Sequence, residues 1–168
     1  DPMKDLVPFV SLASNEFFLA ANPNQPFKSF GEFIAYAKQA KEPLHYGSSG
    51  NGSQHHLMME MLKARAGIDL VHVPFKGSSP ATVAAMAGEI PVLFAGASVG
   101  PQITAGKLRA LAVAAPQRLA AFPSVPTIAE TYPGFRNSIW MGLCAPKGTP
   151  EPILRKLRAE VNKALAAP

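Results

Sequence analysis

The residues with the clearest chemical potential form a glycine–serine loop. Residues 46–56 read YGSSGNGSQHH, with three glycines and three serines between Gly47 and Ser53. Glycine permits positive φ and lets backbone amides approach a ligand closely. An apolar helical pattern follows, so the loop ends at a helix N-terminus, where unpaired amides and the helix dipole favour an anion. The alternative is an ordinary turn with Ser53 as the helix N-cap.

The spacing of the glycines argues against nucleotide binding. Gly47, Gly50 and Gly52 reverse the G-x-G-x-x-G order, and the next strand ends in Phe75 and Lys76 where an acidic residue is expected. No Lys-Ser or Lys-Thr pair closes the loop, as a phosphate-binding P-loop requires. We therefore expect no nucleotide cofactor.

Nucleophilic and metal chemistry have less support from spacing. Residues 47–51, GSSGN, lack the last glycine of a G-x-S-x-G nucleophile elbow. His55 and His56 are adjacent, about a quarter-turn apart on a helix, so they cannot share one metal ion as an i, i+4 pair would. We expect both histidines to pack near the helix cap, and a contact between an imidazole and a carboxylate ligand stays open.

The composition indicates a globular chain without a nucleic-acid or membrane segment. Of the 168 residues, 48% are hydrophobic and 16% charged, and the net charge is +5. The basic residues are scattered without interleaved aromatics, which disfavours nucleic-acid binding, and no apolar run is long enough to span a membrane. The first residues, DPMKD, hold neither a signal peptide nor an initiator methionine, as expected of an excised segment. Cys144 lies in an apolar run and is expected to be a buried small hydrophobe.

Strands alternate with helices along the chain, which predicts βαβ crossovers and a mainly parallel sheet. Loops near Gly50, Lys76 and Gly96 each follow the carboxyl end of a strand, and such ends face the ligand crevice of an open α/β sheet. The expected strands are residues 7–12, 17–21, 44–46, 70–75, 90–94, 108–114 and 138–145. The expected helices are residues 30–41, 53–66, 79–88, a short one through 103, 127–131 and 150–165.

Apolar periodicity also predicts which residues these elements bury. Ser79 is expected to cap the third helix, with Pro80 in its first turn. Trp140 and Met141 are expected in the core or closing over a ligand. The second helix is expected to bury Leu57, Met58, Met61 and Leu62, and the last helix Leu154, Leu157, Val161 and Leu165.

Taken together, these motifs resemble the Bug-type (tripartite tricarboxylate transporter, TctC-like) periplasmic solute-binding proteins over nearly the whole chain. Each motif alone is weak, whereas their order and spacing are specific. They are Asp1-Pro2, Asn22-Pro23, the loop Tyr46–Leu57, Val71–Gly77, Gly106–Ala112, Pro123–Thr127 and Trp140–Pro150.

The resemblance implies a two-lobed protein of the type II periplasmic-binding-protein fold that closes on a small carboxylate and delivers it to a membrane permease. Residues 23–137 would form a complete second lobe. Residues 1–22 and 138–168 would be hinge or crossover remnants of the first lobe, whose own ligand loop is not in this chain. A periplasmic location and a non-enzymatic role follow from the same resemblance.

The resemblance also assigns the ligand-binding residues. Members of the family often have an acidic residue after the phenylalanine equivalent to Phe94, where this chain has Ala95; its absence favours a plain mono- or dicarboxylate over an amino acid. The residues expected to contact the ligand are Gly47, Ser48, Ser49, Gly50, Asn51, Gly52, Ser53, His56, Pro74, Phe75, Lys76, Gly77, Ala95 and Gly96.

Two other functions remain open at this point. One is an α/β enzyme that acts on a carboxylate and uses Ser48 or His56 in its chemistry. The other is a sensory ligand-binding lobe of the same fold.

Overall fold

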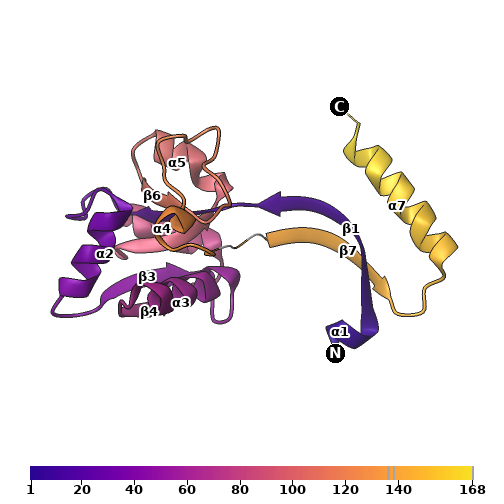
Figure 1. The fold of residues 1–168 in the computed structure, drawn as a ribbon, viewed down its shortest axis with the longest axis horizontal. Helices are drawn as coiled ribbons and strands as arrows, with labels where there is room; N and C mark the ends of the chain where they lie inside the picture. Colours follow the sequence, from indigo (N-terminus) through magenta and orange to yellow (C-terminus); the bar gives the residue numbers. More distant parts are fainter. Residues whose placement is uncertain (136, 138, 168) are drawn as a thin grey trace. The chain divides into compact units, whose positions relative to one another are not determined.

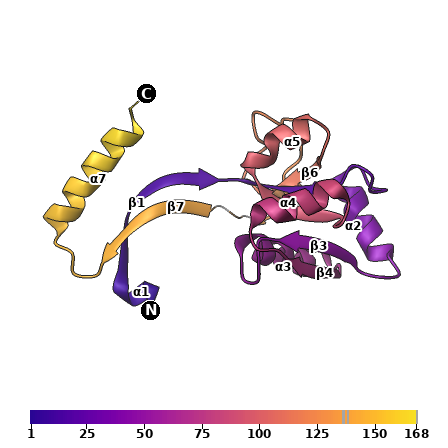
Figure 2. The same ribbon diagram turned by 180° about the vertical axis from the view of Figure 1, so that it is seen from behind.

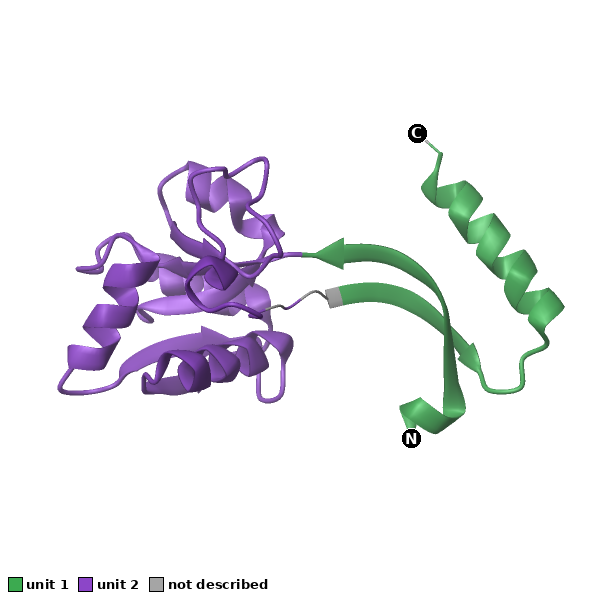
Figure 3. Ribbon diagram, viewed as in Figure 1, with its two compact units in different colours: residues 1–15, 138–168 green, residues 16–137 purple. Residues whose placement is uncertain are grey.

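The chain folds into two compact units. The computed structural model describes residues 1–135, 137 and 139–167. Residues 1–15 together with 138–168 form one unit, which we call the strand-pair unit, and residues 16–137 form the other, the sheet unit (Figures 1 and 3). The sheet unit begins one strand earlier than the boundary expected at residue 23, because residues 17–21 pair with two of its strands.

The sheet unit is built on a five-stranded mixed sheet. β3 is parallel to β4 and β5, whereas β2 is antiparallel to β5 and β6. Four of the five strands therefore run in one direction and β2 runs against them, which confirms the expected α/β fold. In spatial order the strands are β4 (Leu70–Pro74), β3 (Leu44–Ser48), β5 (Val92–Gly96), β2 (Phe17–Ala21) and β6 (Arg109–Val113).

Helices lie on both faces of this sheet (Figures 1 and 2). The strand β2, which lies between β5 and β6, is buried along all five residues, because side chains alternate between two covered faces. Phe18 and Ala20 pack with α4 in the core, whereas the ring of Phe17 lies against His55 of α3. The helices of this unit are α2 (Phe30–Gln39), α3 (Gln54–Ala66), α4 (Ser78–Ala87), the 3-10 turn η1 (Ala97–Val99), α5 (Gly100–Thr104) and α6 (Ile128–Thr131).

The two ends of α3 follow the capping residues in the sequence, whereas the start of α4 does not. Ser53 caps α3 by accepting a hydrogen bond from the amide of His56, and Gly67 ends the helix in the left-handed conformation, as predicted. The prediction of Ser79 as the cap of α4 is wrong. Gly77, at φ +119°, turns the chain early enough for the helix to begin at Ser78.

The buried face of α3 differs in part from the expected one. Met58 and Leu62 are buried as predicted, but Leu57 and Met61 are 55% and 41% exposed. The buried side of α3 consists instead of Met58, Met59, Leu62 and Ala66. Both stripes are apolar in sequence, so the contact of α3 with β3 and β5 decides between them.

The strand-pair unit contains two long antiparallel strands and one amphipathic helix. β1 and β7 pair along their lengths, with register shifts near Pro8 and Ser11. The helix α7 contacts β1 through buried Leu154 and through Arg158, whose Nε donates to the carbonyl of Phe9 at 2.8 Å. Its elements are α1 (Pro2–Asp5), β1 (Leu6–Asn15), β7 (Ile139–Pro146) and α7 (Glu151–Leu165).

Several apolar side chains of this unit are exposed, contrary to expectation. Trp140 and Met141 are each 54% exposed, and Cys144 is exposed as well. The expected burial of Cys144 and the core position expected for Trp140 and Met141 are wrong for residues 1–168, because among the described strands β7 pairs only with β1, and two strands leave most of their faces uncovered. The alternative, that Trp140 and Met141 close over a ligand, stays a prediction.

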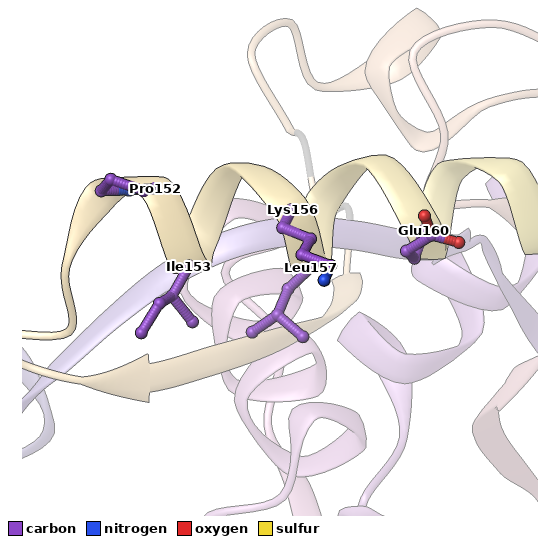
Figure 4. Close-up of a pocket in the computed structure, with 5 residues that line it drawn as sticks. All are labelled: Pro152, Ile153, Lys156, Leu157 and Glu160. Atoms are coloured by element: carbon purple, nitrogen blue, oxygen red, sulfur yellow. The ribbon is translucent and has the colours of Figure 1, made fainter.

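The face of α7 that carries Ile153 and Leu157 is also exposed. Of its predicted buried face, Leu154 is buried, but Leu157 and Leu165 are 43% and 53% exposed. Ile153 and Leu157, one turn apart, project from the same side of the helix (Figure 4). They line a groove of about 370 Å³ together with Pro152, Lys156 and Glu160.

Candidate functional site

Three loops meet at one edge of the sheet unit. β4, β3 and β5 are parallel neighbours, so the residues after Pro74, Ser48 and Gly96 leave the sheet at the same edge. The amide of Phe75 donates to the carbonyl of Ser48 at 3.0 Å, which ties the first two loops together. The topology thus gathers the three sequence-predicted loops, and we call this region the loop edge.

Ser48 is a structural residue of the glycine–serine loop. It ends β3 and is 1% exposed. Its Oγ accepts from the amide of Gly50 at 3.1 Å and lies 3.1 Å from that residue's carbonyl oxygen and 2.6 Å from Nε2 of His72. A serine beside a histidine is also the arrangement of a nucleophile and its base, but this hydroxyl is shielded from solvent and already engaged. The structure therefore gives Ser48 the task of shaping the loop.

The glycines of the loop have different structural tasks. Gly47 lies within β3, and a Cβ there would collide with Cδ1 of Ile90, so its small size serves packing. Gly50 and Gly52 have φ of +127° and +72°, which side chains rarely adopt. Both amides donate hydrogen bonds within residues 46–56. The amide of Gly52 donates to Nδ1 of His56 at 3.0 Å, and the amide of Gly50 donates to Oγ of Ser48.

Open backbone donors remain where the loop enters α3. Within the described residues, the amide of Ser53 donates to the carbonyl of Gly50 and that of His56 to Ser53 Oγ, whereas no hydrogen bond occupies the amides of Gln54 and His55. The first turn of a helix has no intrahelical acceptor for these groups. The helix dipole adds partial positive charge at this point, so the geometry suits an anion.

Three aromatic rings stack behind the loop. The imidazoles of His56 and His72 lie 3.9 Å apart and 9° from parallel, and the ring of Tyr46 stacks on His72 at 5.0 Å. Tyr46 donates its hydroxyl to Glu60 at 2.7 Å, and Lys63 also donates to that carboxylate, at 3.0 Å. The stack is a rigid support under Ser48 and Gly52, the two loop residues that hydrogen-bond to these histidines.

The pKa values in this support follow from burial and from its charges. Burial lowers the pKa of His72, and the nearby His56 and Lys63 lower it further, against the opposing effect of Glu60. Burial, with the bond to Glu60, raises the pKa of Tyr46. Burial alone raises the pKa of Glu60, but the hydrogen bonds from Tyr46 and Lys63 reverse this and lower it. Glu60 is therefore ionised, and its negative charge lies close to His56 and His72.

His55, which was expected to pack near the cap, lies at the loop edge. Its Nδ1 is 2.7 Å from the hydroxyl of Ser49, and its ring meets Phe17 edge-on at 5.2 Å. Burial lowers the pKa of His55, so the neutral imidazole is favoured. His55 thus holds Ser49 close to the open amides of α3.

The other predicted residues occupy distinct positions along this edge. Lys76 and Pro74 are exposed, whereas Phe75 is half-buried against the core. Ala95 is 2% exposed and packs in the core, and Gly96 pairs with Phe17. Asn51 and Gly52 are exposed, and Gly77 caps α4.

Two residues at the loop edge were not singled out from the sequence. Asn137 accepts a hydrogen bond from Nε2 of Gln54 at 2.6 Å, and its own Nδ2 is buried without a partner among the described residues. Glu16, directly before β2, has a buried Oε2 that is likewise unpartnered there. The sequence signal was a polar residue at the start of a fully apolar strand, but only the strand order places it at this edge.

The described parts of the chain contain neither a cluster of three metal-ligating side chains nor a membrane-spanning helix. In those parts, no three His, Cys, Asp or Glu side chains are arranged to hold a metal ion. Among the described helices, none combines the length and apolar character needed to cross a membrane.

Comparison with known proteins decides the family. The model of the tripartite tricarboxylate transporter family receptor matches residues 1–168. The chain belongs to this receptor family. A protein encoded in the tcbD-tcbE intergenic region of Pseudomonas sp. (strain P51) is 38% identical over 168 residues, which are 98% of this chain and 50% of that protein. Protein BugT of Bordetella pertussis is 35% identical over 165 residues, 97% of this chain and 51% of that protein. The chain thus spans about half the length of the curated relatives it matches.

Solved structures of receptor-family proteins have the same fold. The structure of Rpa4515 from R. palustris with adipate is 32% identical, with a TM-score of 0.88, over 99% of this chain and 56% of that one. MatC (Rpa3494) from Rhodopseudomonas palustris with bound malate is 34% identical, with a TM-score of 0.86, over 96% and 56%. The periplasmic binding protein BugD is 30% identical at the same TM-score, over 97% and 55%. Family members are periplasmic solute-binding proteins, and two of these neighbours hold dicarboxylates.

Proposed function

We propose that this chain is part of a periplasmic receptor that captures a small carboxylate between two lobes and delivers it to the permease of a tripartite tricarboxylate transporter. The observation that carries the proposal is the pair of open amides, Gln54 and His55, at the start of α3. They lie on the loop edge, and solved relatives hold adipate and malate. The receptor family supports the transporter partner.

The proposed carboxylate site differs in detail from the one expected from the sequence. The oxyanion would accept hydrogen bonds from the amides of Gln54 and His55, with Nδ2 of Asn137 as a third donor. Charge-assisted bonds of this kind are stronger than neutral ones. The hydroxyl of Ser49 and the ammonium of Lys76 would add positive potential, and Ser48 and His72 would hold the loop in shape.

The two units fit a division into lobes. The sheet unit would be the complete second lobe, and the strand-pair unit the part of the first lobe that this chain contains. Selectivity by closure requires contacts from both lobes, because a ligand shifts an equilibrium only by its differential affinity for the two states. Residues 1–168 alone are then expected to bind carboxylates poorly.

Native mass spectrometry of the full-length protein, followed by calorimetry with adipate, malate and any co-purified acid, tests this function. We expect a bound carboxylate in the full-length protein and at least a hundredfold weaker binding by residues 1–168. Micromolar affinity of residues 1–168 alone would contradict the two-lobe mechanism. A full-length protein that binds no carboxylate would contradict the function itself.

A further inference from the structure

Glu16 lies at the loop edge beside the third predicted contact region. Phe17, the next residue, pairs with Gly96 at the end of β5, so Glu16 stands where the two antiparallel strands leave the sheet. The carbonyl of Phe17 also accepts from the amide of Ala114, just beyond β6. Glu16 therefore belongs to the same edge as the open amides of α3.

One oxygen of the Glu16 carboxylate has no partner in the described part of the chain. Its Oε2 is fully buried and forms no hydrogen bond to any described residue. Three buried side-chain atoms share this state in the described chain; Asn137 Nδ2 lies at the same edge, and Gln102 Oε1 lies in α5. A buried polar atom without a partner destabilises the folded protein, and such atoms are rare in folded proteins.

The chemistry of this oxygen differs from that of the amides. The amides of Gln54 and His55 are donors and suit an anion, whereas a carboxylate accepts hydrogen bonds. Burial, which removes water from the carboxylate, raises the pKa of Glu16. A ligand that supplied a donor would remove this cost, whereas a second ionised carboxylate placed there would add repulsion.

We propose that Glu16 is a specificity residue that selects carboxylates bearing a hydroxyl or ammonium group over acids that lack such a donor. The proposal rests on the proposed function, because it assumes that the ligand's carboxylate occupies the amides of α3. It also differs from the plain mono- or dicarboxylate expected from the sequence. The acidic side chain missing after Phe94 would be supplied by Glu16, the residue directly before the neighbouring strand β2.

Calorimetry on the full-length protein with matched acids tests the proposal. The pairs are succinate and malate, propionate and lactate, and phenylacetate and mandelate, with aspartate, alanine and phenylglycine as the amino counterparts. In the unmodified protein, the acid with the donor is expected to bind about tenfold or more tightly than its plain partner, as befits a hydrogen bond to a charged group. In Glu16→Leu this ratio is expected to fall close to one, while the plain acids bind as well or better.

Glu89→Gln is the matched control, because Glu89 is an exposed carboxylate of the same unit before β5, at the opposite edge. It should leave the ratio unchanged. Glu16→Gln, which keeps the shape and one oxygen, should give an intermediate ratio if Glu16→Leu fails to fold. Binding with an unaltered ratio in both Glu16 variants would overturn this inference alone. Absence of binding by every acid in the unmodified protein would overturn the proposed function and the inference with it.

Discussion

The amides of the glycine–serine loop divide into two groups. Those of Gly50, Gly52 and Ser53 donate within the loop and shape it, whereas those of Gln54 and His55 are open. Local sequence is enough to predict the loop and the Ser53 cap. It cannot predict that Ser48 is enclosed by His72, because that contact depends on the pairing of β3 with β4.

Replacing Gly52 tests the loop without disturbing the core. Gly52→Asp in the full-length protein is expected to abolish carboxylate binding, because it places negative charge beside the open amides of α3. It also forces a side chain into φ +72°, which costs about 1–2 kcal/mol. Calorimetry with the co-purified acid, or with malate, measures the loss.

Gly106→Asp is the control for that variant. Gly106 has nearly the same φ, +70°, and equally open surroundings, but it precedes β6 at the opposite edge of the sheet. It should lose similar stability and keep its affinity. Retained affinity in Gly52→Asp would show that the loop is not part of the binding site.

His72 is expected to make the protein less stable in mild acid. Its folded-state pKa is lowered, mainly by burial, so the unfolded chain binds more protons once the pH falls below the ordinary imidazole value of 6.5. The free energy of unfolding should therefore decrease from pH 7.5 to pH 5, with His55 contributing in the same direction. Below the folded-state pKa the penalty is constant.

Thermal unfolding of the full-length protein across this pH range measures the effect. His72→Gln should show a smaller decrease than the unmodified protein, whereas His45→Gln, at an exposed position of β3, should behave like the unmodified protein. Equal slopes for all three proteins would show that His72 does not contribute.

Among the elements, β3, β4 and β5 position the site. Their alternation with α3 and α4 in sequence is enough to predict that they are parallel and that their loops share an edge. The reversed strand β2 is not predictable in this way, because residues 17–21 read only as an apolar strand and their partners lie far along the chain. Glu16 was missed for the same reason. The exposed face of α3 was missed because both of its stripes are apolar.

Gly47 allows the strand β3 to pack closely against Ile90 of the core. Gly47→Ala is expected to destabilise the full-length protein by about 1–3 kcal/mol, the cost of overpacking, because the new Cβ meets Cδ1 of Ile90. The double variant Gly47→Ala with Ile90→Val removes that Cδ1 and should recover most of the loss. Denaturant unfolding gives both values, and a double variant no more stable than Gly47→Ala would assign the cost to another cause.

At the scale of the whole molecule, the strand-pair unit exposes several large apolar side chains. Ile153 and Leu157 of α7 are half-exposed along the groove of Figure 4, and Trp140 and Met141 are exposed on β7. Exposed apolar side chains that gather in one region mark a contact surface, and Ile153 and Leu157 lie together on α7. Since the matched relatives are about twice as long, we expect the rest of the polypeptide to cover this face.

Leu157→Gln in the full-length protein tests whether the rest of the polypeptide covers this face of α7. Burial of a leucine side chain contributes about 1.5–3 kcal/mol, so the variant should be destabilised by that amount in denaturant unfolding. Arg155→Gln, on the opposite side of α7 and exposed, should change stability by less than about 0.5 kcal/mol. Equally small losses of stability in both variants would show that this face of α7 is exposed to solvent in the full-length protein.

The position of β2 between β5 and β6 also determines when the sheet can assemble. During synthesis, at about 5–20 residues per second, residues 17–21 emerge long before the partner strands 92–96 and 109–113. Until then the segment FFLAA has no ladder on either side and no covered face, which is the state that holding chaperones recognise and that aggregates when left alone. The first strand of the sheet to leave the ribosome is therefore the last to gain both of its neighbours.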